Sequence, residues 1–232
     1  MASPRFFLLT SQLFPFLLLF ITSHPCQAQN VSLSLYYETL CPYCADFIVN
    51  DLVKLFDEGL ISIVNLRLVP WGNAVMQPDG SFVCQHGEYE CLLNSIDACT
   101  ITIYPDVDRH FRFIHCVERL VLENNINEWV HCFDRTGLGT VPIDCYKSGY
   151  GNLLEKQYAA ETFQLNPSHE FVPWVLVNGQ PLREDFKNFV SYVCKAYQGK
   201  QVPQACQSSL PVPLMNHTFK KANLSNPVCY AK

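Results

Sequence analysis

The sequence has little charge, and it has no long apolar run beyond its N-terminal end. Charged residues make up 16% of the chain, against about 25% in an average globular protein. The formal net charge is −5, so no basic surplus favours binding to nucleic acid. No later run reaches the roughly eighteen apolar residues that a membrane span needs. No linker-like stretch divides the chain, which favours a single domain.

The N-terminal residues have the pattern of a secretory signal peptide. Arg5 supplies a positive charge, residues 6–21 are mostly apolar, and Ala28 suits a cleavage site. We assign residues 1–28 to the signal peptide. We expect the protein to enter the secretory pathway and to be either secreted or located in the lysosome or vacuole. The alternative, a retained anchor, is disfavoured because the run is short and contains Pro15. After removal of the signal we therefore expect no membrane anchor.

Because the sequence has few charged residues to form ion pairs, cysteine is the candidate for stabilising the fold. Twelve cysteines occur, and cleavage after Ala28 leaves eleven, which predicts a disulfide framework in an oxidising compartment. Asn30, Asn216 and Asn223 begin Asn-x-Ser/Thr sequons and are predicted glycosylation sites. Eight cysteines are candidates for structural disulfides whose pairing the sequence leaves open: Cys84, Cys91, Cys99, Cys116, Cys132, Cys145, Cys194 and Cys206.

Hydrophobic periodicity predicts an α/β domain over residues 29–199. Alternating apolar residues indicate a strand at 31–36, helical spacing follows from Cys44 to Gly59, and residues 61–69 read as a buried strand, which completes a βαβ unit. Residues 83–163 are helical and cysteine-rich and are predicted to be an insertion. A strand at 171–177, a turn at Asn178-Gly179 and an amphipathic helix follow. Residues 200–232 are predicted to be a loosely ordered, possibly processed tail.

A Cys-Pro-Tyr-Cys motif lies where the first strand meets the first helix. Cys41 at the helix start is the candidate nucleophile, because free backbone N–H groups and the helix dipole stabilise its thiolate. Cys44, one turn later and covered, is the candidate resolving thiol. A zinc site is disfavoured, because no second Cys-x-x-Cys or spaced His pair exists. Purely structural bridges are disfavoured by the position at a strand–helix junction.

Four further residues are candidates for contact with substrate. Pro42 suits the first helical turn and Tyr43 adds bulk. Val172 and Pro173 begin a later strand, and two interpretations stay open: an ordinary edge-strand proline, or a cis peptide bond that faces the cysteines.

Two histidines beside cysteines raise the question of a metal site. His86 and His115 are interpreted as polar neighbours of structural disulfides, because no tetrahedral set of ligands assembles from the spacings. We predict no metal and no cofactor. Glu88, Glu90 and Asp97 receive no acid–base role.

The segment from Cys84 to Cys99 resembles the signature Cys-Gln-His-Gly-x-x-Glu-Cys-x-x-Asn-x-x-x-x-Cys of the gamma-interferon-inducible lysosomal thiol reductase family. Further similarity includes Tyr37-Glu38, Tyr104-Pro105 and Val172-Pro173-Trp174-Val175. The resemblance implies a thioredoxin-like fold with a helical insertion, and reduction of protein disulfides at acid pH by Cys41 and Cys44. We expect the signature itself to lie away from the redox pair.

Function and partners follow as expectations. The substrates are disulfide-bonded proteins, and a small-molecule thiol is the expected electron donor. Two alternatives stay open: an oxidase or isomerase that uses the same pair, and a disulfide-stapled binding module without turnover. With Cys41 and Cys44 reserved for chemistry, one of the nine other cysteines must be left over, and Cys229 in the tail is predicted to be that residue.

Overall fold

The computed structural model describes residues 29–207 and 227–231. The predicted signal peptide and the sequons at Asn216 and Asn223 lie outside these residues. Asn30 is described: it is partly exposed, and its Nδ2 donates to Asn65 Oδ1 at 3.3 Å. None of the described helices is long and apolar enough to cross a membrane.

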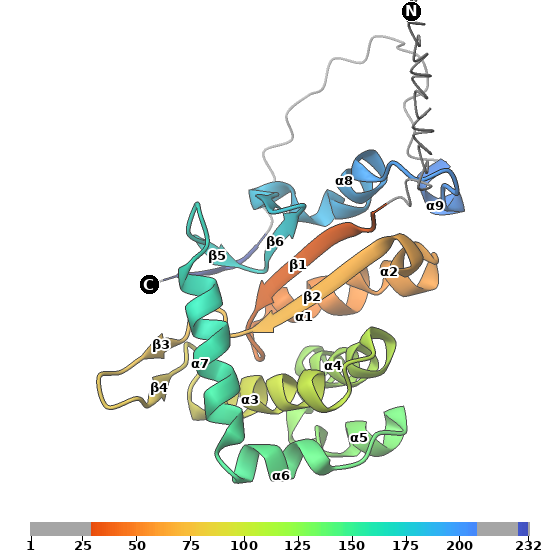
Figure 1. Ribbon diagram of the computed structural model, residues 1–232. Helices are drawn as coiled ribbons and strands as arrows, with labels where there is room; N and C mark the ends of the chain where they lie inside the picture. The colour runs from red at the N-terminus through yellow and green to blue at the C-terminus, as the bar shows by residue number, and fades with distance from the viewer. Residues whose placement is uncertain (1–28, 208–226, 232) are drawn as a thin grey trace, which may run out of the picture.

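The N-terminal half of the core is the predicted βαβ unit (Figure 1). Strand β1 (Val31–Tyr37) is followed by a helical run made of α1 (Pro42–Asp46), a π-helical turn (Phe47–Leu52) and α2 (Lys54–Asp57). The run ends before Gly59, whose φ of 70° is easy only for glycine. Strand β2 (Val64–Pro70) then pairs parallel to β1, with Val31 opposite Val64. It begins later than predicted, because Leu60–Ile63 form a 3-10 turn.

The second half of the core adds antiparallel strands to the same sheet. β6 (Trp174–Val177) pairs with β1, and β7 (Gln180–Pro181) pairs with β6, so the strand order is β2-β1-β6-β7. The predicted turn is confirmed: Asn178 and Gly179 have φ of 48° and 75°, as a tight hairpin requires.

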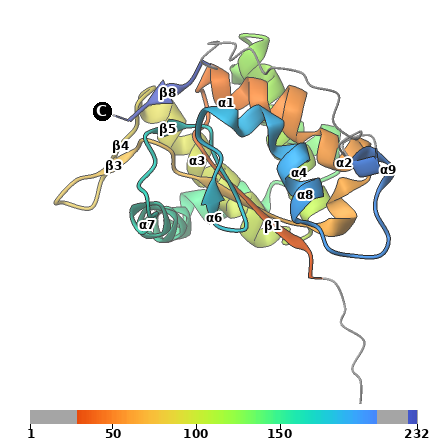
Figure 2. The same cartoon turned by 90° about the horizontal axis from the view of Figure 1, so that it is seen from above.

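Helices cover both faces of this sheet (Figure 2). α1 and α8 (Phe189–Ala196) lie on one side of β1, where Phe47 packs edge-on against Phe186 and Phe189. Phe186 belongs to the 3-10 helix Arg183–Asn188 that leads into α8. α7 (Tyr150–Phe163) lies on the other side, where Tyr36 donates to Glu161 at 3.3 Å. Burial of these aromatic rings dominates the packing energy of the core.

The predicted helical insertion is confirmed, and a short hairpin, β3 (Val75–Met76) with β4 (Phe82–Val83), precedes it. The remaining helical elements of the insertion are α3 (Glu88–Ile103), α4 (Val107–Leu122), a 3-10 turn (Ile126–Glu128), α5 (His131–Thr136) and α6 (Val141–Lys147). Disulfides join these elements: Cys84–Cys91 at the start of α3, Cys99–Cys145 between α3 and α6, and Cys116–Cys132 between α4 and α5. The chain is therefore an α/β protein whose inserted helices are stapled to one another.

The described parts of the predicted tail contain two short elements. α9 (Gln204–Gln207) is tied to α8 by the Cys194–Cys206 disulfide. β8 (Cys229–Tyr230) pairs antiparallel with β5 (Phe171–Val172). Pro173 alone separates β5 from β6. The end of the chain thus returns to the middle of the fold. The extent of the signal peptide and of the tail stays a prediction.

Candidate active site

Cys41 and Cys44 lie where β1 turns into α1. Leu40 makes the turn with a φ of 66°, and Cys41 is the N-cap residue of α1, whose carbonyl accepts from Ala45 N at 3.0 Å. Pro42 occupies the first helical turn, where its missing N–H has no cost. This local geometry places the first cysteine at the open end of the helical run and the second one turn inside it.

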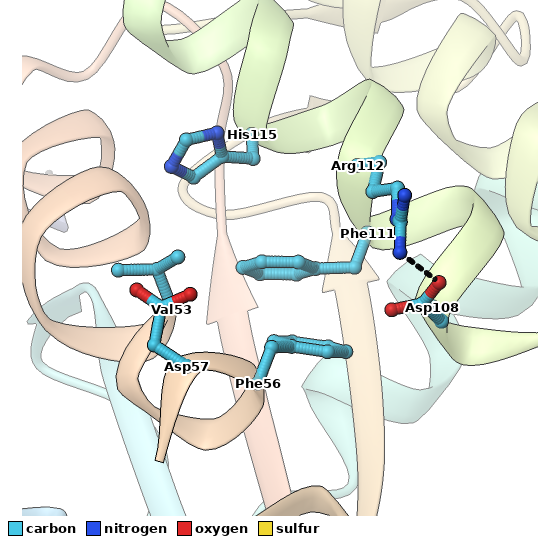
Figure 3. Close-up of a pocket in the computed structure, with 7 residues that line it drawn as sticks. All are labelled: Val53, Phe56, Asp57, Asp108, Phe111, Arg112 and His115. Carbon is cyan, nitrogen blue, oxygen red and sulfur yellow. Dashed lines mark ion pairs between the residues drawn. The ribbon is translucent and has the colours of Figure 1, made fainter. Parts of the chain in front are cut away.

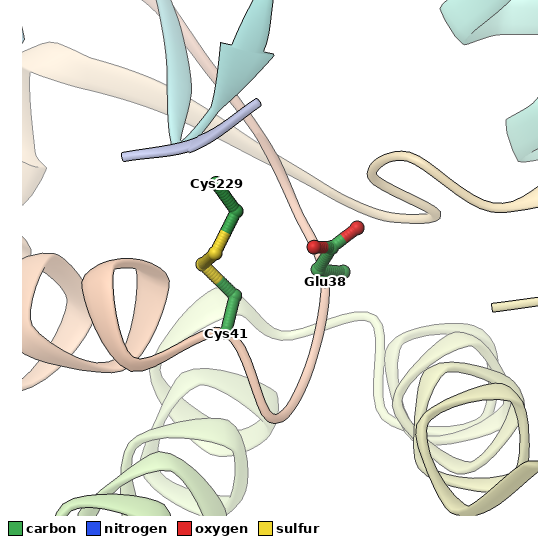
Figure 4. A group of neighbouring side chains, drawn as sticks. All are labelled: Glu38, Cys41 and Cys229. Carbon is green, nitrogen blue, oxygen red and sulfur yellow. A yellow bond between two sulfur atoms is a disulfide. The ribbon is translucent and has the colours of Figure 1, made fainter. Parts of the chain in front are cut away.

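Cys41 is bonded to Cys229, with the two Cα atoms 6.5 Å apart (Figure 4). The prediction that Cys229 is the unpaired cysteine is therefore wrong. Cys41 itself is 0% exposed. The physical reason is the pairing of β8 with β5, which carries Cys229 over the start of α1 across 188 residues of sequence. Nothing in the sequence indicated that Cys229, 188 residues after Cys41, would lie next to it in the folded chain.

Cys44 is the free cysteine of the described residues, and it is completely buried. Burial raises the pKa of its thiol well above the ordinary value, and the negative charge of Glu38 raises it further. A hydrogen bond from the Glu38 backbone acts in the opposite direction. Cys44 is accordingly a protonated thiol held beneath a sulfur that is already in a disulfide.

Glu38, at the end of β1, is the acidic residue of the site. One of its oxygens lies within 4.8 Å of the sulfurs of both Cys41 and Cys229, and Oε2 accepts from Asn73 N at 2.6 Å. Burial raises the pKa of the Glu38 carboxyl to about 7, helped by the charge of Glu90. Gly72, with φ of 59°, leaves room for this carboxylate, since a Cβ there would meet Glu38 Cβ at 2.5 Å. Nothing in the spacing of the sequence indicated a role for Glu38 in the site.

The signature segment borders the site, so the expectation that it lies away from the redox pair is wrong. His86 Nδ1 lies 2.6 Å from Glu90 Oε2 and 3.6 Å from Glu38 Oε1. Gln85 Nε2 donates to the carbonyl of Tyr230 at 3.0 Å. The Cys84–Cys91 disulfide positions both residues, because it closes the loop that carries them onto the start of α3. Gln85 and His86 come close to Cys41 only in the folded chain.

Two groups in the described residues have the spacing of metal ligands, and they share Glu38. In the first group, the sulfurs of Cys41 and Cys229 are bonded to each other, and a metal takes up thiolates rather than disulfide sulfurs. In the second, His86 is already hydrogen-bonded to Glu90. We therefore propose no metal site at either group.

The four residues predicted to contact substrate lie in two places: within the motif, and at the strand that pairs with β8. Pro42 and Tyr43 are exposed beside them. Val172 is fully buried and pairs with Cys229 in the β5–β8 ladder. The Val172–Pro173 peptide bond is cis, which confirms the second interpretation of this proline. The structure thus brings Val172 to the residue that is bonded to Cys41, although Val172 lies 128 positions after Cys44 in the sequence (172 − 44).

Three more carboxyls are buried inside the insertion, and no pattern in the sequence indicated their burial. Asp97, Glu118 and Glu155 are at most 2% exposed. Burial raises the pKa of Asp97 to about 7, opposed by the hydroxyl of Tyr37, which donates to it at 2.8 Å. Burial also raises the pKa values of Glu118 and Glu155 well above 4.5. The interior beneath the redox site therefore favours neutral carboxyls.

A cavity of about 290 Å³ lies elsewhere, between α2 and α4 (Figure 3). Its lining includes Phe56 and Phe111, which stack at 4.2 Å, and His115, whose pKa is lowered by burial. Neither Cys41 nor Cys44 lines it.

Comparison with known proteins agrees with this geometry. A family model described as gamma interferon inducible lysosomal thiol reductase (GILT) matches residues 32–136. The gamma-interferon-responsive lysosomal thiol protein of Arabidopsis thaliana is 42% identical over 184 residues, which are 78% of this chain and 77% of that protein. The gamma-interferon-inducible lysosomal thiol reductase of Mus musculus is 36% identical over 187 residues, 79% of this chain and 74% of that protein.

Solved structures show the same fold. DsbA of Mycobacterium tuberculosis in its oxidised form is 17% identical, with a TM-score of 0.52 over 77% of this chain and 87% of that one. The reduced disulfide oxidoreductase DsbG of the same organism is 19% identical, with a TM-score of 0.51 over 77% of this chain and 82% of that one. The predicted thioredoxin-like fold with a helical insertion is confirmed.

Proposed function

Because this chain belongs to the gamma-interferon-inducible lysosomal thiol reductase family, we propose that it reduces disulfide bonds in protein substrates, with Cys41 as the attacking thiolate and Cys44 as the resolving thiol. One observation carries the assignment of roles: a free, buried Cys44 lies one helical turn after a Cys41 that is bonded to another segment. That is the arrangement of sulfurs expected in a mixed disulfide between enzyme and substrate.

The reaction consists of two exchanges. The Cys41 thiolate attacks one sulfur of the substrate disulfide, and the other substrate sulfur leaves as a thiolate that takes up a proton. Cys44 then loses its proton and attacks the Cys41 sulfur, which expels the second substrate thiol and forms a Cys41–Cys44 disulfide. A small-molecule thiol reduces this disulfide and closes the cycle. Before the first turnover, the bond from Cys41 to Cys229 must open.

Acid pH favours this chemistry because of Glu38. Its carboxylate lies within 4.8 Å of the Cys41 sulfur, and a negative charge at that distance disfavours a thiolate. With a pKa of about 7, the Glu38 carboxyl is mostly neutral in acid and mostly charged in alkali. The repulsion is therefore absent below neutrality. The names of the relatives, which call them lysosomal, support the same compartment, and we propose entry through the predicted signal peptide.

Reduction of insulin at about pH 5 and about pH 8 tests the proposal. Wild-type protein should be active, and the Cys41→Ser variant should be inactive at both pH values. The Glu38→Gln variant keeps a neutral side chain at every pH, so the ratio of its activity to that of wild type should be higher at about pH 8 than at about pH 5. Activity that survives Cys41→Ser would overturn the role of Cys41.

The direction of the reaction is part of the proposal and has its own measurement. Equilibration of the Cys41–Cys44 pair with glutathione buffers gives the reduction potential. A reductase needs a pair that is oxidised more readily than the thiols of its substrates. A strongly oxidising potential would instead assign the chain to disulfide formation or isomerisation.

A further inference from the structure

The hairpin of β3 and β4 presents a pair of apolar side chains to solvent. Val75 and Val83 are opposite each other in its ladder, and they are 54% and 55% exposed. The neighbouring pair is Met76 with Phe82, and Phe82 packs edge-on against Trp71 at 5.2 Å between ring centres. Because side chains alternate along a strand, the face that carries the valine pair is opposite the face that Phe82 anchors to the body of the protein.

Strand formation alone does not require valine at these two positions. Threonine has nearly the shape of valine and a similar preference for strands, and its hydroxyl is compatible with water. Isolated apolar residues are common on protein surfaces, so the exposure of the valine pair is not by itself a sign of function. The position of the pair relative to the redox site indicates what it contacts.

The base of the same face touches the segment that is bonded to Cys41. Asn73 and Gln85 lie two residues from the valine pair, one in each arm of the hairpin, and Asn73 Nδ2 donates to Gln85 Oε1 at 2.9 Å. Asn73 Nδ2 also lies 3.1 Å from the carbonyl oxygen of Cys229, and Gln85 Nε2 donates to the carbonyl of Tyr230 at 3.0 Å. The face is therefore continuous from the redox site out to the valine pair.

The direction of the hairpin matches that of the segment at the redox site. Figures 1 and 2 show β8 and the hairpin of β3 and β4 extending toward the same side of the molecule. An extended chain advances about 3.3 Å per residue, so a polypeptide bonded to Cys41 reaches the valine pair with residues roughly three to five positions from its cysteine. A small disulfide is too short to make this contact.

We propose that the valine pair, Val75 and Val83, is a specificity surface for unfolded protein substrates, and that it contacts their apolar side chains while Cys41 exchanges their disulfide. Unfolded chains are the occupant because they expose apolar side chains near their cysteines, whereas folded proteins bury most of them. The inference rests on the proposed function, because it assumes that Cys41 attacks substrate disulfides.

The test uses the full chain with Cys44→Ser and Cys229→Ser, in which Cys41 is the remaining thiol of the site. The probes are extended peptides whose central cysteine is in a mixed disulfide with a chromogenic aryl thiol. The first peptide has leucine at roughly three to five positions on either side of the cysteine, and the second has serine there. A third probe joins mercaptoethanol to the same aryl thiol. Release of the aryl thiol gives the rate of attack by Cys41.

Partial burial of leucine against the valine pair should make attack on the leucine peptide about fivefold faster than attack on the serine peptide. Val75→Thr/Val83→Thr keeps the shape of the hairpin but adds two hydroxyls, so it should lower this preference to about twofold. The matched control is Val141→Thr at the start of α6, where the valine is 53% exposed. That variant should keep the full preference.

A change of charge tests the contact independently. Val75→Glu should create a preference of about twofold for a peptide with lysine in place of leucine over the serine peptide, since an exposed ion pair contributes little. The preference should disappear at high salt, because salt screens exposed charges.

The contrary results have different meanings. Equal rates for the leucine and serine peptides, or a preference that Val75→Thr/Val83→Thr leaves intact, would overturn the specificity surface and leave the proposed function standing if the mercaptoethanol probe reacts normally. An intact preference together with a change from dimer to monomer on sedimentation would assign the valine pair to contact between two copies of this chain. No attack on any probe would overturn the proposed role of Cys41, and the inference with it.

Discussion

The helical insertion and the redox site both contain disulfides with at least one buried cysteine, but they differ in what lies beside them. Cys99 and Cys132 of the insertion and Cys41 of the redox site are all 0% exposed. The bridges of the insertion join neighbouring helices, and the described residues hold no free thiol except Cys44. Only the Cys41–Cys229 bridge has that thiol one helical turn away. We therefore expect exchange at this bridge to depend on the neighbouring thiol rather than on exposure.

The two regions also use burial differently. In the insertion, burial and helix packing make each bridge a permanent cross-link that restricts the unfolded chain. At the redox site, burial raises the pKa of the Cys44 thiol well above its ordinary value, so that Cys44 is protonated beside the Cys41–Cys229 bridge. Glu38, Gln85 and His86 connect the regions, because the loop that starts the insertion also borders the site. A family signature that looks structural in sequence is thus part of the site.

Selective reduction should give the largest difference between the regions. With limiting small-molecule thiol, Cys229 should become available for alkylation on the order of a hundredfold faster than the cysteines of the insertion, because attack by Cys44 within the molecule far exceeds attack from solution. Differential alkylation with peptide mapping measures this. Cys44→Ser should remove most of the advantage. Early labelling of Cys99 or Cys145, or an unchanged rate in Cys44→Ser, would contradict the comparison.

Removal of a bridge from the insertion should reduce stability while activity persists. Cys99 and Cys145 close a loop of 46 residues, so replacing both by Ala should lower the free energy of unfolding by about 4 kcal/mol in the chain-entropy model. Cys84 and Cys91 are 7 residues apart, and the same replacement there should cost about 2.4 kcal/mol. Urea unfolding at acid pH, where exchange is slow, gives both values. Loss of insulin reduction in the folded Cys99→Ala/Cys145→Ala variant would contradict a purely structural role for this bridge of the insertion.

The buried carboxyls should make the fold more stable in acid than in alkali. Asp97 has a pKa of about 7 in the folded protein against an ordinary 3.8, so the folded state binds more protons than the unfolded state between these values. Stability is then full below the unfolded pKa and is lost as pH rises through about 7. Burial lowers the pKa values of His110, His115 and His169, and these groups act in the opposite direction near their ordinary pKa. Asp97→Asn leaves them unchanged, so its comparison with wild type isolates the effect of Asp97.

Urea unfolding at about pH 6.5 and about pH 8 measures this effect. Wild-type protein should lose stability across the window, and Asp97→Asn should lose less. A matched control is Asp79→Asn at an exposed loop, where hydrogen bonds from Ser81 lower the pKa of the carboxyl, so this variant should follow wild type. Equal slopes for all three proteins would show that Asp97 does not titrate in this range.

Much of the fold was predictable, because the patterns that encode it are local. The alternation in β1, the helical spacing after Cys44 and the Asn178-Gly179 turn each depend on neighbouring residues, and all three are confirmed. The return of Cys229 to Cys41 was not predictable, because it depends on the pairing of β8 with β5 across 188 residues. Glu38 was missed for a similar reason: its neighbours Asn73 and Glu90 approach it only in the folded chain.

Trapping of substrate tests the central claim most directly. Cys44→Ser should carry out the first exchange but not the second, so it should accumulate covalent complexes with a disulfide-bonded protein that separate on adding reductant. Cys41→Ser should trap nothing, because the buried Cys44 thiol is a poor nucleophile. Both variants also carry Cys229→Ser, which removes the bond to Cys41 and a second thiol that could trap substrate. The complexes are read on non-reducing gels. Complexes formed by Cys41→Ser and none by Cys44→Ser would reverse the roles of the two cysteines.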